Sequence, residues 1–228
     1  MVRASQEDLR NYRPVANLNF ISKVIEKVAT TQIMDYLTEN NLHIPTQSAY
    51  KHHHSVETAL TRVQDDIARS LDQRQEVIVV LLDFTSAFDT IDHVIMLNRF
   101  AGRYGFDGSV LKWLSSYLSG RSHVVKIGNV FSHTVQDNCG VPQGSVMGPT
   151  LFTLYSAPIY DIIKAHGLSS MIYADDIQVY LTFPSTDREM AIRRINNCIS
   201  DIILWSIKNK LLKSYISHLD LLQRHHVL

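Results

Sequence analysis

The 228-residue sequence has little cysteine, no long apolar run and no excess of charge of either sign. Its two cysteines, Cys139 and Cys198, are far apart and belong to no Cys-x-x-Cys pair, which argues against a disulfide framework and a cysteine zinc site. The longest apolar run covers residues 77–82, whereas a membrane span needs about 20 residues. The N-terminus also lacks the apolar core of a signal peptide. The sequence therefore predicts a soluble, intracellular chain.

The charges cancel over the whole chain, with 22 Lys and Arg against 22 Asp and Glu. Neutrality argues against a protein that coats DNA on its own. The distribution is uneven, because residues 76–183 carry six basic against nine acidic side chains, and residues 184–228 carry seven against four. The apolar fraction of 45% excludes a disordered chain. The acidic middle of the chain is the place to look for bound cations.

Apolar periodicity predicts several helices. In residues 20–39 apolar side chains recur every three or four positions, which predicts a helix with one buried face. A second helix is predicted to begin after the N-cap Ser55 and to carry an apolar stripe as far as Leu71. Further helices are predicted at residues 92–100, 109–118, 151–164, with Pro149 as a first helical residue, and 187–209.

Strand patterns alternate irregularly with these helices. Residues 77–82 are β-branched and apolar without alternation, as in a strand buried on both faces, and they lead directly into Asp83. Residues 123–127 and 130–135 flank a Gly-Asn pair that is typical of a hairpin turn. Residues 170–174 and 177–183 predict a second hairpin with Asp175 and Asp176 at its tip. Hairpins mixed with helices favour an α+β fold.

The adjacent Asp175 and Asp176 are the sharpest chemical feature. Two neighbouring carboxylates repel each other unless a cation or solvent compensates, and Mg²⁺ prefers such oxygen ligands. A solvated turn is the plain alternative, since aspartate is common in hairpin loops. Asp83 strengthens the metal interpretation, because a carboxylate at the end of a buried strand can meet the pair on a neighbouring strand. Such a cage holds two metal ions about 4 Å apart in phosphoryl-transfer enzymes.

Five segments carry recognisable motifs. Residues 173–176 read Tyr-Ala-Asp-Asp, residues 81–89 read Leu-Leu-Asp-Phe-Thr-Ser-Ala-Phe-Asp, and residues 140–145 read Gly-Val-Pro-Gln-Gly-Ser. Arg13-Pro14 precedes the first predicted helix, and residues 47–51 read Gln-Ser-Ala-Tyr-Lys. In the same order along the chain, these segments resemble motifs of the reverse transcriptases of non-LTR (LINE-type) retrotransposons, jockey-like or chicken-repeat-like in character: the YxDD box, the first catalytic aspartate motif, the PQG motif and two segments of the fingers. Together the matches cover about residues 5–213.

The resemblance implies a right-hand polymerase fold of the α+β class, with an antiparallel palm sheet packed on helices. Residues 1–75 are expected to be fingers-like. Residues 76–213 are expected to be palm-like and catalytic, with finger helices interspersed. Residues 214–228 do not match the family and are expected to be a divergent tail, as in a truncated or frameshifted copy, with the thumb absent.

The resemblance also implies a metal site. Asp83 and Asp175 would bind the catalytic ions and Asp176 would support them, and Phe84 joins the metal set. The expected cofactor is Mg²⁺, with Mn²⁺ as an alternative. No membrane contact is expected.

A nucleotide site is implied beside the metal site. Lys51, Phe88, Gln143 and Gly144 would bind the incoming nucleotide, with Phe88 as an aromatic gate that clashes with a 2′-hydroxyl. Gln143 and Tyr173 would lie beside the template and the primer end. The plain alternatives are core packing for Phe88 and Tyr173, and a simple turn and helix start for Gln143 and Gly144.

The expected function is RNA-directed DNA polymerisation, in which deoxynucleoside triphosphates are added to the 3′-hydroxyl of a DNA primer on an RNA template. An inactive remnant that only binds nucleic acid is the main alternative, and a two-metal nuclease is the third. Action in the nucleus is implied only by the family. The sequence gives no prediction of the oligomeric state.

Overall fold

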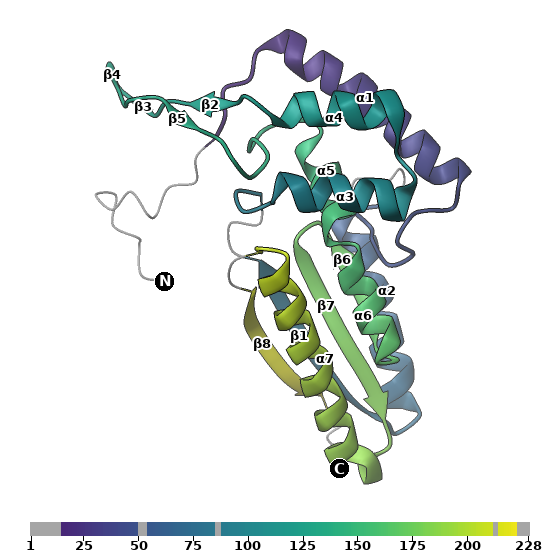
Figure 1. The fold of residues 1–228 in the computed structure, drawn as a ribbon. Coiled ribbons are helices and arrows are strands. Elements are labelled where there is room, and N and C mark those ends of the chain that lie inside the picture. The colour runs from purple at the N-terminus through teal and green to yellow at the C-terminus, as the bar shows by residue number, and fades with distance from the viewer. Residues whose placement is uncertain (1–14, 50–53, 85–87, 212–213, 223–228) are drawn as a thin grey trace.

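The computed structural model describes residues 15–49, 54–84, 88–211 and 214–222 (Figure 1). Its centre is a four-stranded sheet in the order β6-β7-β1-β8, in which every neighbouring pair is antiparallel. The strands are β1 (Glu76–Phe84), β6 (Ser169–Tyr173), β7 (Asp176–Phe183) and β8 (Ser214–Leu222). The predicted α+β class is confirmed. Strand β1 therefore lies inside the sheet, between two partners that come much later in the sequence.

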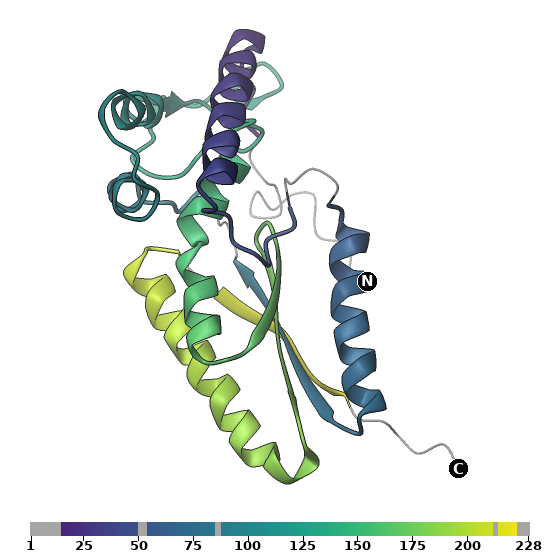
Figure 2. The same ribbon diagram turned by 90° about the vertical axis from the view of Figure 1, so that its right-hand side faces the viewer.

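Helices cover both faces of the sheet. Helix α2 (Val56–Asp72) packs on one face against β1 and β6, and α6 (Pro158–Ala165) and α7 (Arg188–Lys208) pack on the other (Figure 2). The short 3₁₀ helix η2 (Ser185–Asp187) leads into α7. Burial from both sides explains the unbroken apolar run of β1, in which Val77 and Val80 are fully buried.

A group of helices lies at the end of the sheet where β1 ends (Figure 1). It consists of α1 (Phe20–Glu39), α3 (His93–Tyr104), α4 (Gly108–Leu118) and α5 (Gly148–Ser156). Aromatic rings join these helices, since Phe106 lies 5.5 Å from Tyr36 and 5.7 Å from Phe100 between ring centroids. The hydroxyl of Tyr36 also donates to the carbonyl of Tyr104 at 2.8 Å. These contacts tie α1 to α3.

The predicted start of α2 is confirmed in atomic detail. The hydroxyl of Ser55 accepts a hydrogen bond from the Thr58 amide at 3.2 Å, and the Thr58 hydroxyl accepts one from the Ser55 amide at 2.9 Å. This reciprocal pair is a capping box, which satisfies two amides that helix geometry leaves unpaired. Helix α3 begins in a similar way, with the Asp92 carboxylate accepting from the Ile95 amide at 2.9 Å.

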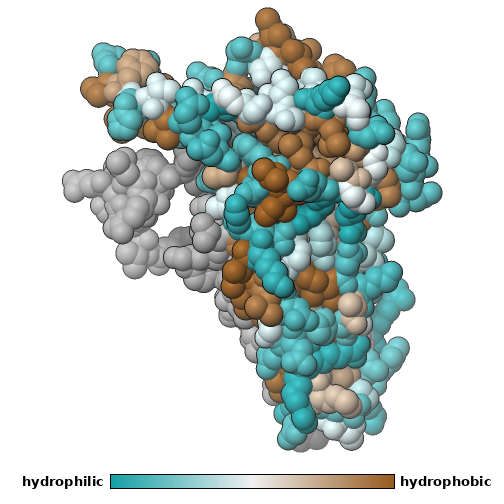
Figure 3. Space-filling model, viewed as in Figure 1, coloured by the Kyte–Doolittle hydropathy of each residue, from teal (hydrophilic) through white to brown (hydrophobic). Residues whose placement is uncertain are grey.

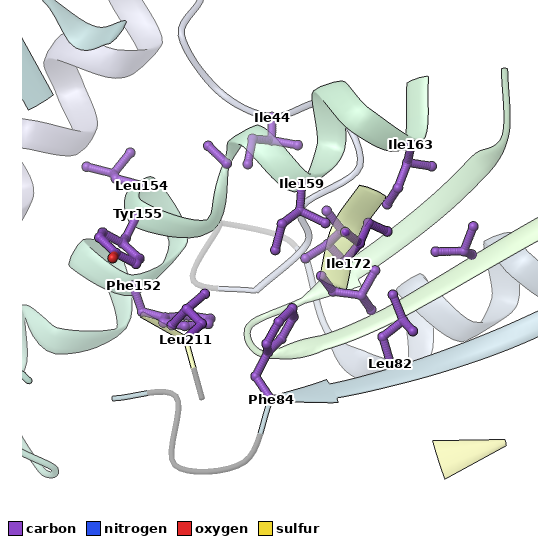
Figure 4. Packing of buried hydrophobic residues seen from close by; sticks show 14 of the residues in the cluster. Ile44, Leu82, Phe84, Phe152, Leu154, Tyr155, Ile159, Ile163, Ile172 and Leu211 are labelled. Atoms are coloured by element: carbon purple, nitrogen blue, oxygen red, sulfur yellow. The ribbon is translucent and has the colours of Figure 1, made fainter. Parts of the chain in front are cut away.

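Two hydrophobic clusters hold the layers together. The larger one fills the space between the sheet, helices α6 and α7, and the group formed by α1, α3, α4 and α5 (Figure 4). Phe84, Phe152, Tyr155, Ile172 and Leu211 belong to it. The smaller cluster lies between the sheet and α2 and consists of Ala59, Val63, Val77, Met171 and Tyr180. The end of β1 is thus held in place by packing in the larger cluster, on the side of the sheet where α5, α6 and α7 lie.

The expectation of one buried apolar face along α1 is wrong for its first half. Phe20 and Ile21 are 80% and 69% exposed, whereas Ile33 and Leu37 are buried. Val24, Ile25 and Val28 are also exposed and line a groove beside α4. Apolar patches are visible over this helical end and at the tip of the long hairpin (Figure 3). The apolar periodicity predicted the helix correctly, but it did not show which turns of the helix are covered by neighbouring elements.

The single helix predicted over residues 151–164 is wrong, because two helices occupy this stretch. Helix α5 ends at Ser156 and α6 begins at Pro158, with Ala157 between them. Proline has no backbone N–H and its ring crowds the preceding turn, so it starts a helix more readily than it continues one.

Other elements differ from their prediction in extent. The first predicted hairpin exists, but it is divided into β2 (Ser122–His123) paired with β5 (Val135–Gln136), and β3 (Lys126–Ile127) paired with β4 (Val130–Phe131). The sequence predicts no strand in the expected tail, yet Ser214–Leu222 forms β8. Within the described ranges, none of the helices combines the length and apolar character that a membrane span requires.

Candidate functional site

The end of β1 and the β6–β7 hairpin bring three carboxylates to one corner of the sheet. Leu82 pairs with Ile177, so the next residue, Asp83, lies opposite Asp176. Asp175 lies in the adjoining turn between β6 and β7. The sequence places both aspartates between the strands, whereas the structure makes Asp176 the first residue of β7. The predicted meeting of these side chains across neighbouring strands is therefore present.

The carboxylates of Asp175 and Asp83 act electrostatically on Asp176. Partial burial raises the pKa of Asp176 above its ordinary value, and the negative charges of Asp175 and then Asp83 raise it further. Both causes disfavour the ionised form of Asp176, because its charge is partly desolvated and faces two like charges. A cation at this corner would reverse the effect of the neighbouring charges.

The chemistry of these donors suits a hard divalent cation. Carboxylate oxygens are the ligands that Mg²⁺ prefers, and it commonly takes one or two of them together with substrate phosphates. Among the described residues, no group of three or more His, Cys, Asp or Glu side chains is arranged so that it could hold a metal ion. The side chain of Phe84 is buried in the core, so only its backbone carbonyl is suited to a metal contact.

Gln47 supports the turn that carries Asp175. Its side-chain carbonyl accepts hydrogen bonds from the amide of Ala49 at 2.9 Å and from the amide of Ala174 at 3.3 Å. Ala174 has a φ of 58°, in the left-handed region, which costs a non-glycine residue roughly 1–2 kcal/mol. The side chain of Gln47 is buried, and its amide nitrogen has no hydrogen-bond partner among the described residues.

The segment around Gln47 also pairs with β6. The amide of Ile172 donates to the carbonyl of Thr46 at 3.0 Å, and the amide of Ser48 donates to the carbonyl of Ile172 at 2.9 Å. This parallel bridge fixes residues 46–48 beside the hairpin. Lys51, the predicted triphosphate contact, follows this segment and lies outside the described residues.

We expect Gln47→Leu to lower the free energy of unfolding by about 2 kcal/mol, because it leaves the buried amide of Ala174 without an acceptor. We also expect about 10-fold slower primer extension, because the strained turn before Asp175 loses its support. Urea denaturation and single-turnover extension measure the two effects. Gln73→Leu, which makes the same change at an exposed position, is the control. Wild-type stability and rate in Gln47→Leu would contradict this role.

The loop of residues 140–147 is attached to the segment that follows β1. The side-chain amide of Gln143 donates to both carboxylate oxygens of Asp89, each at 3.1 Å. The amide of Val141 donates to the carbonyl of Phe88 at 2.8 Å. Phe88 and Gln143, which the sequence assigns to one nucleotide site, are thus brought together by this short network.

Gly144 lies where a side chain does not fit well. Its φ is 94°, a backbone conformation that L residues rarely adopt. A Cβ at this position would approach the carbonyl oxygen of Ala16 to 3.4 Å. The amide of Ala16 also donates to the carbonyl of Gln143 at 2.9 Å, so the segment before α1 runs directly along this loop.

The two remaining aromatic candidates are both partly buried. The ring of Phe88 lies 5.3 Å from that of Phe152 and packs against the larger core cluster. Tyr173 packs against the smaller cluster under α2 and is paired with Asp176. Both rings therefore have a packing role, and contact with a nucleotide or primer stays a prediction for each.

Two residues that the sequence assigns to no site contribute to this arrangement. Gln47 appears in a family motif, but nothing in the pattern shows that its side chain reaches Ala174. Glu26 is fully buried and bonds to the loop after Gly144. The helical spacing could have predicted the burial of Glu26, because this residue lies seven positions before Ile33 and therefore on the same face of the helix.

Comparison with solved structures identifies the class of fold. The structure is similar to apo telomerase from Candida tropicalis, with a TM-score of 0.61 over 87% of this chain and 40% of that chain. Telomerase from Candida albicans gives a TM-score of 0.59 over 90% of this chain and 36% of that chain. The identity is 12% in both cases, so the likeness is one of fold.

Comparison of sequences identifies the family. A model described as reverse transcriptase (RNA-dependent DNA polymerase) matches residues 5–218, and this chain belongs to that family. It is 26% identical over 205 residues to a probable RNA-directed DNA polymerase from transposon BS and 30% identical over 172 residues to one from transposon X-element, both of Drosophila melanogaster. These matches cover 88% and 74% of this chain, but only 22% and 19% of the relatives. The resemblance read from the motifs is confirmed.

Proposed function

We propose that this chain is the catalytic part of an RNA-directed DNA polymerase, which adds deoxynucleoside triphosphates to a DNA primer on an RNA template. The observation that carries the proposal is the corner at which Asp176 lies opposite Asp83 and next to Asp175, and is influenced by the charge of each. The relatives are named as RNA-directed DNA polymerases of mobile elements, which supports the same reaction. Residues 1–75 would supply fingers and residues 76–213 the palm, with α3 and α4 as finger helices within it.

Asp83 and Asp175 would hold the divalent ions, and Asp176 would support them. Bound Mg²⁺ supplies positive charge that neutralises the attacking and leaving oxygens in an in-line displacement. The residues of this chain contribute position: β1 fixes Asp83, and Gln47 fixes the turn of Asp175. The aligned primer hydroxyl then attacks the α-phosphate, and pyrophosphate leaves.

The loop of Gln143 and Gly144 would receive the template and the incoming nucleotide. Gln143 has one amide that can contact a base edge, and Gly144 leaves room for a backbone to approach. In the structure this amide is held by Asp89, so template binding would compete with that bond. Phe88, whose carbonyl accepts from the Val141 amide of this loop, would select against ribonucleotides.

Primer extension by the purified chain on an RNA template with Mg²⁺ tests the proposal. We expect lengthened primers that vanish when EDTA removes the metal. Salt-dependent binding of primer–template without extension, in a chain shown by circular dichroism to be folded, would instead indicate a nucleic-acid-binding remnant. Shortened strands would indicate a two-metal nuclease.

A further inference from the structure

Glu26 is a buried carboxylate in the first half of α1, where most of the apolar side chains are exposed. It is only 1% exposed, although Phe20, Val24 and Ile25 on the same helix are open to solvent. Burial of a carboxylate is costly unless hydrogen bonds or charges compensate. The partners of Glu26 therefore identify what this part of α1 holds in place.

All the recorded partners of this carboxylate come from elements distant in sequence. One oxygen accepts from the amide of Val146 at 2.6 Å and, at 3.4 Å, from the amide of Met147. The other oxygen accepts from the hydroxyl of Tyr117 on α4 at 3.1 Å. Burial raises the pKa of Tyr117 to about 12, so this hydroxyl remains a donor at neutral pH.

The two amides belong to the loop that leads from Gly144 into α5. Helix α5 has no side-chain cap at Met147, and its entry is instead supported by the hydroxyl of Ser145, which accepts from the Gly148 amide at 2.6 Å. Glu26 satisfies the preceding amides from outside the loop. Its carboxylate also faces the N-terminal, positive end of the α5 dipole, and this dipole stabilises a negative charge.

We propose that Glu26 is a positioning residue for nucleotide and template selection, which acts through the conformation of residues 142–147. This inference rests on the proposed function. The loop is held at one end by Asp89 through the Gln143 side chain and at the other by Glu26. Within the described part of the chain, Glu26 bonds to Tyr117, Val146 and Met147 and to none of the predicted substrate contacts. Its loss frees the Val146 end of the loop and lets Gln143 and Gly144 depart from their observed positions.

A comparison of Glu26→Leu with Glu26→Gln separates the effect of losing the hydrogen bonds to the loop from the effect of losing the charge. The leucine variant removes both acceptor oxygens. In the glutamine variant the carbonyl can still accept from Val146, and the amide can donate to the Tyr117 hydroxyl. For Glu26→Leu we expect the KM for deoxynucleotides to rise about 10-fold, because a buried amide loses its acceptor. We expect the change in kcat to stay below about 3-fold, and Glu26→Gln to restore KM to within about 3-fold of wild type.

Hydrogen exchange supplies a readout that does not depend on catalysis. In Glu26→Leu without nucleotide, we expect the amides of Val146 and Met147 to exchange about 10-fold faster, while β1 and β7 remain protected. Tyr117→Phe is the first control, because it removes one donor to the carboxylate but leaves the loop amides bonded. Glu39→Leu is the second, because it makes the same change at an exposed position of α1.

The outcomes separate this inference from the proposed function. A fall in kcat with unchanged KM, or unchanged exchange at Val146 in Glu26→Leu, would overturn the positioning role. If Glu26→Leu did not fold, failure of Glu26→Gln to keep wild-type protection of Val146 would also count against it. If the wild-type chain extended no primer, the proposed function would fall and selection through the loop would fall with it. The exchange data would then still decide whether Glu26 holds the loop.

Discussion

Asp175→Asn is expected to reduce the rate of nucleotide incorporation at least about 10³-fold, since charge stabilisation by a bound metal contributes several kcal/mol to such a transition state. Asparagine has nearly the shape of aspartate but lacks the charge that would hold the proposed cation. The substitution is expected to leave the β6–β7 hairpin intact, because Asp175 lies in the turn and makes no hydrogen bond to the other described residues that shapes it.

Single-turnover primer extension measures this rate, and thermal unfolding checks the fold. Removing the charge of Asp175 also removes one cause of the raised pKa of Asp176, so unfolding at neutral pH should occur at the same temperature or slightly higher. Asp35→Asn, at an exposed position of α1, is the matched control. An Asp175→Asn variant that extends primers at the wild-type rate would refute the metal assignment.

The second large effect is expected from Phe88→Val, which should reduce discrimination against ribonucleotides by about 10- to 100-fold. The reason is steric, since a ring beneath the sugar excludes a 2′-hydroxyl and a smaller side chain admits it. Valine retains an apolar contact with Phe152, whose ring lies 5.3 Å away. The use of deoxynucleotides should change much less.

The ratio of kcat/KM for a deoxynucleotide to kcat/KM for the matching ribonucleotide is the quantity to measure. Phe131→Val, on the exposed long hairpin, makes the same change away from the site. If Phe88→Val lowered stability but left the ratio unchanged, the ring would serve only as packing. That result would favour the core-packing interpretation of Phe88.

Local patterns in the sequence predicted those features that depend on neighbouring residues. The cap at Ser55 specified the start of α2, and the unbroken apolar run specified a buried β1. The β6–β7 hairpin followed from two short strands separated by Asp175 and Asp176. These features depend on residues close together in the sequence, because capping and strand burial are encoded locally.

Features that depend on distant partners were not predictable in this way. The exposed side chains of α1 have the same spacing as buried ones, and only the packing of the other helices decides which turns are covered. Pairing of β8 with β1 joins segments far apart in the chain. Glu26 and Gln47 bond to backbone groups more than a hundred residues away, and no sequence period reports such contacts.

The break between α5 and α6 is an intermediate case. Pro158 is visible in the sequence and is a recognised signal for the start of a helix. The helical spacing of apolar side chains nevertheless continues across Pro158, and this favoured one long helix. The family motifs supplied the grouping of Asp83, Asp175 and Gln143 that periodicity lacks, although the roles of these residues still await measurement.

The position of β1 in the sheet has a consequence for synthesis on the ribosome. Its two neighbours, β7 and β8, begin at Asp176 and Ser214, so β1 emerges long before either partner exists. Until then, the apolar segment from Val77 to Leu82 has unpaired backbone groups on both sides, and even one such side makes an edge strand prone to aggregation. Formation of the strand that carries Asp83 must await closure of long loops, which slows folding. The nascent chain is therefore most vulnerable to self-association through the strand on which its proposed chemistry depends.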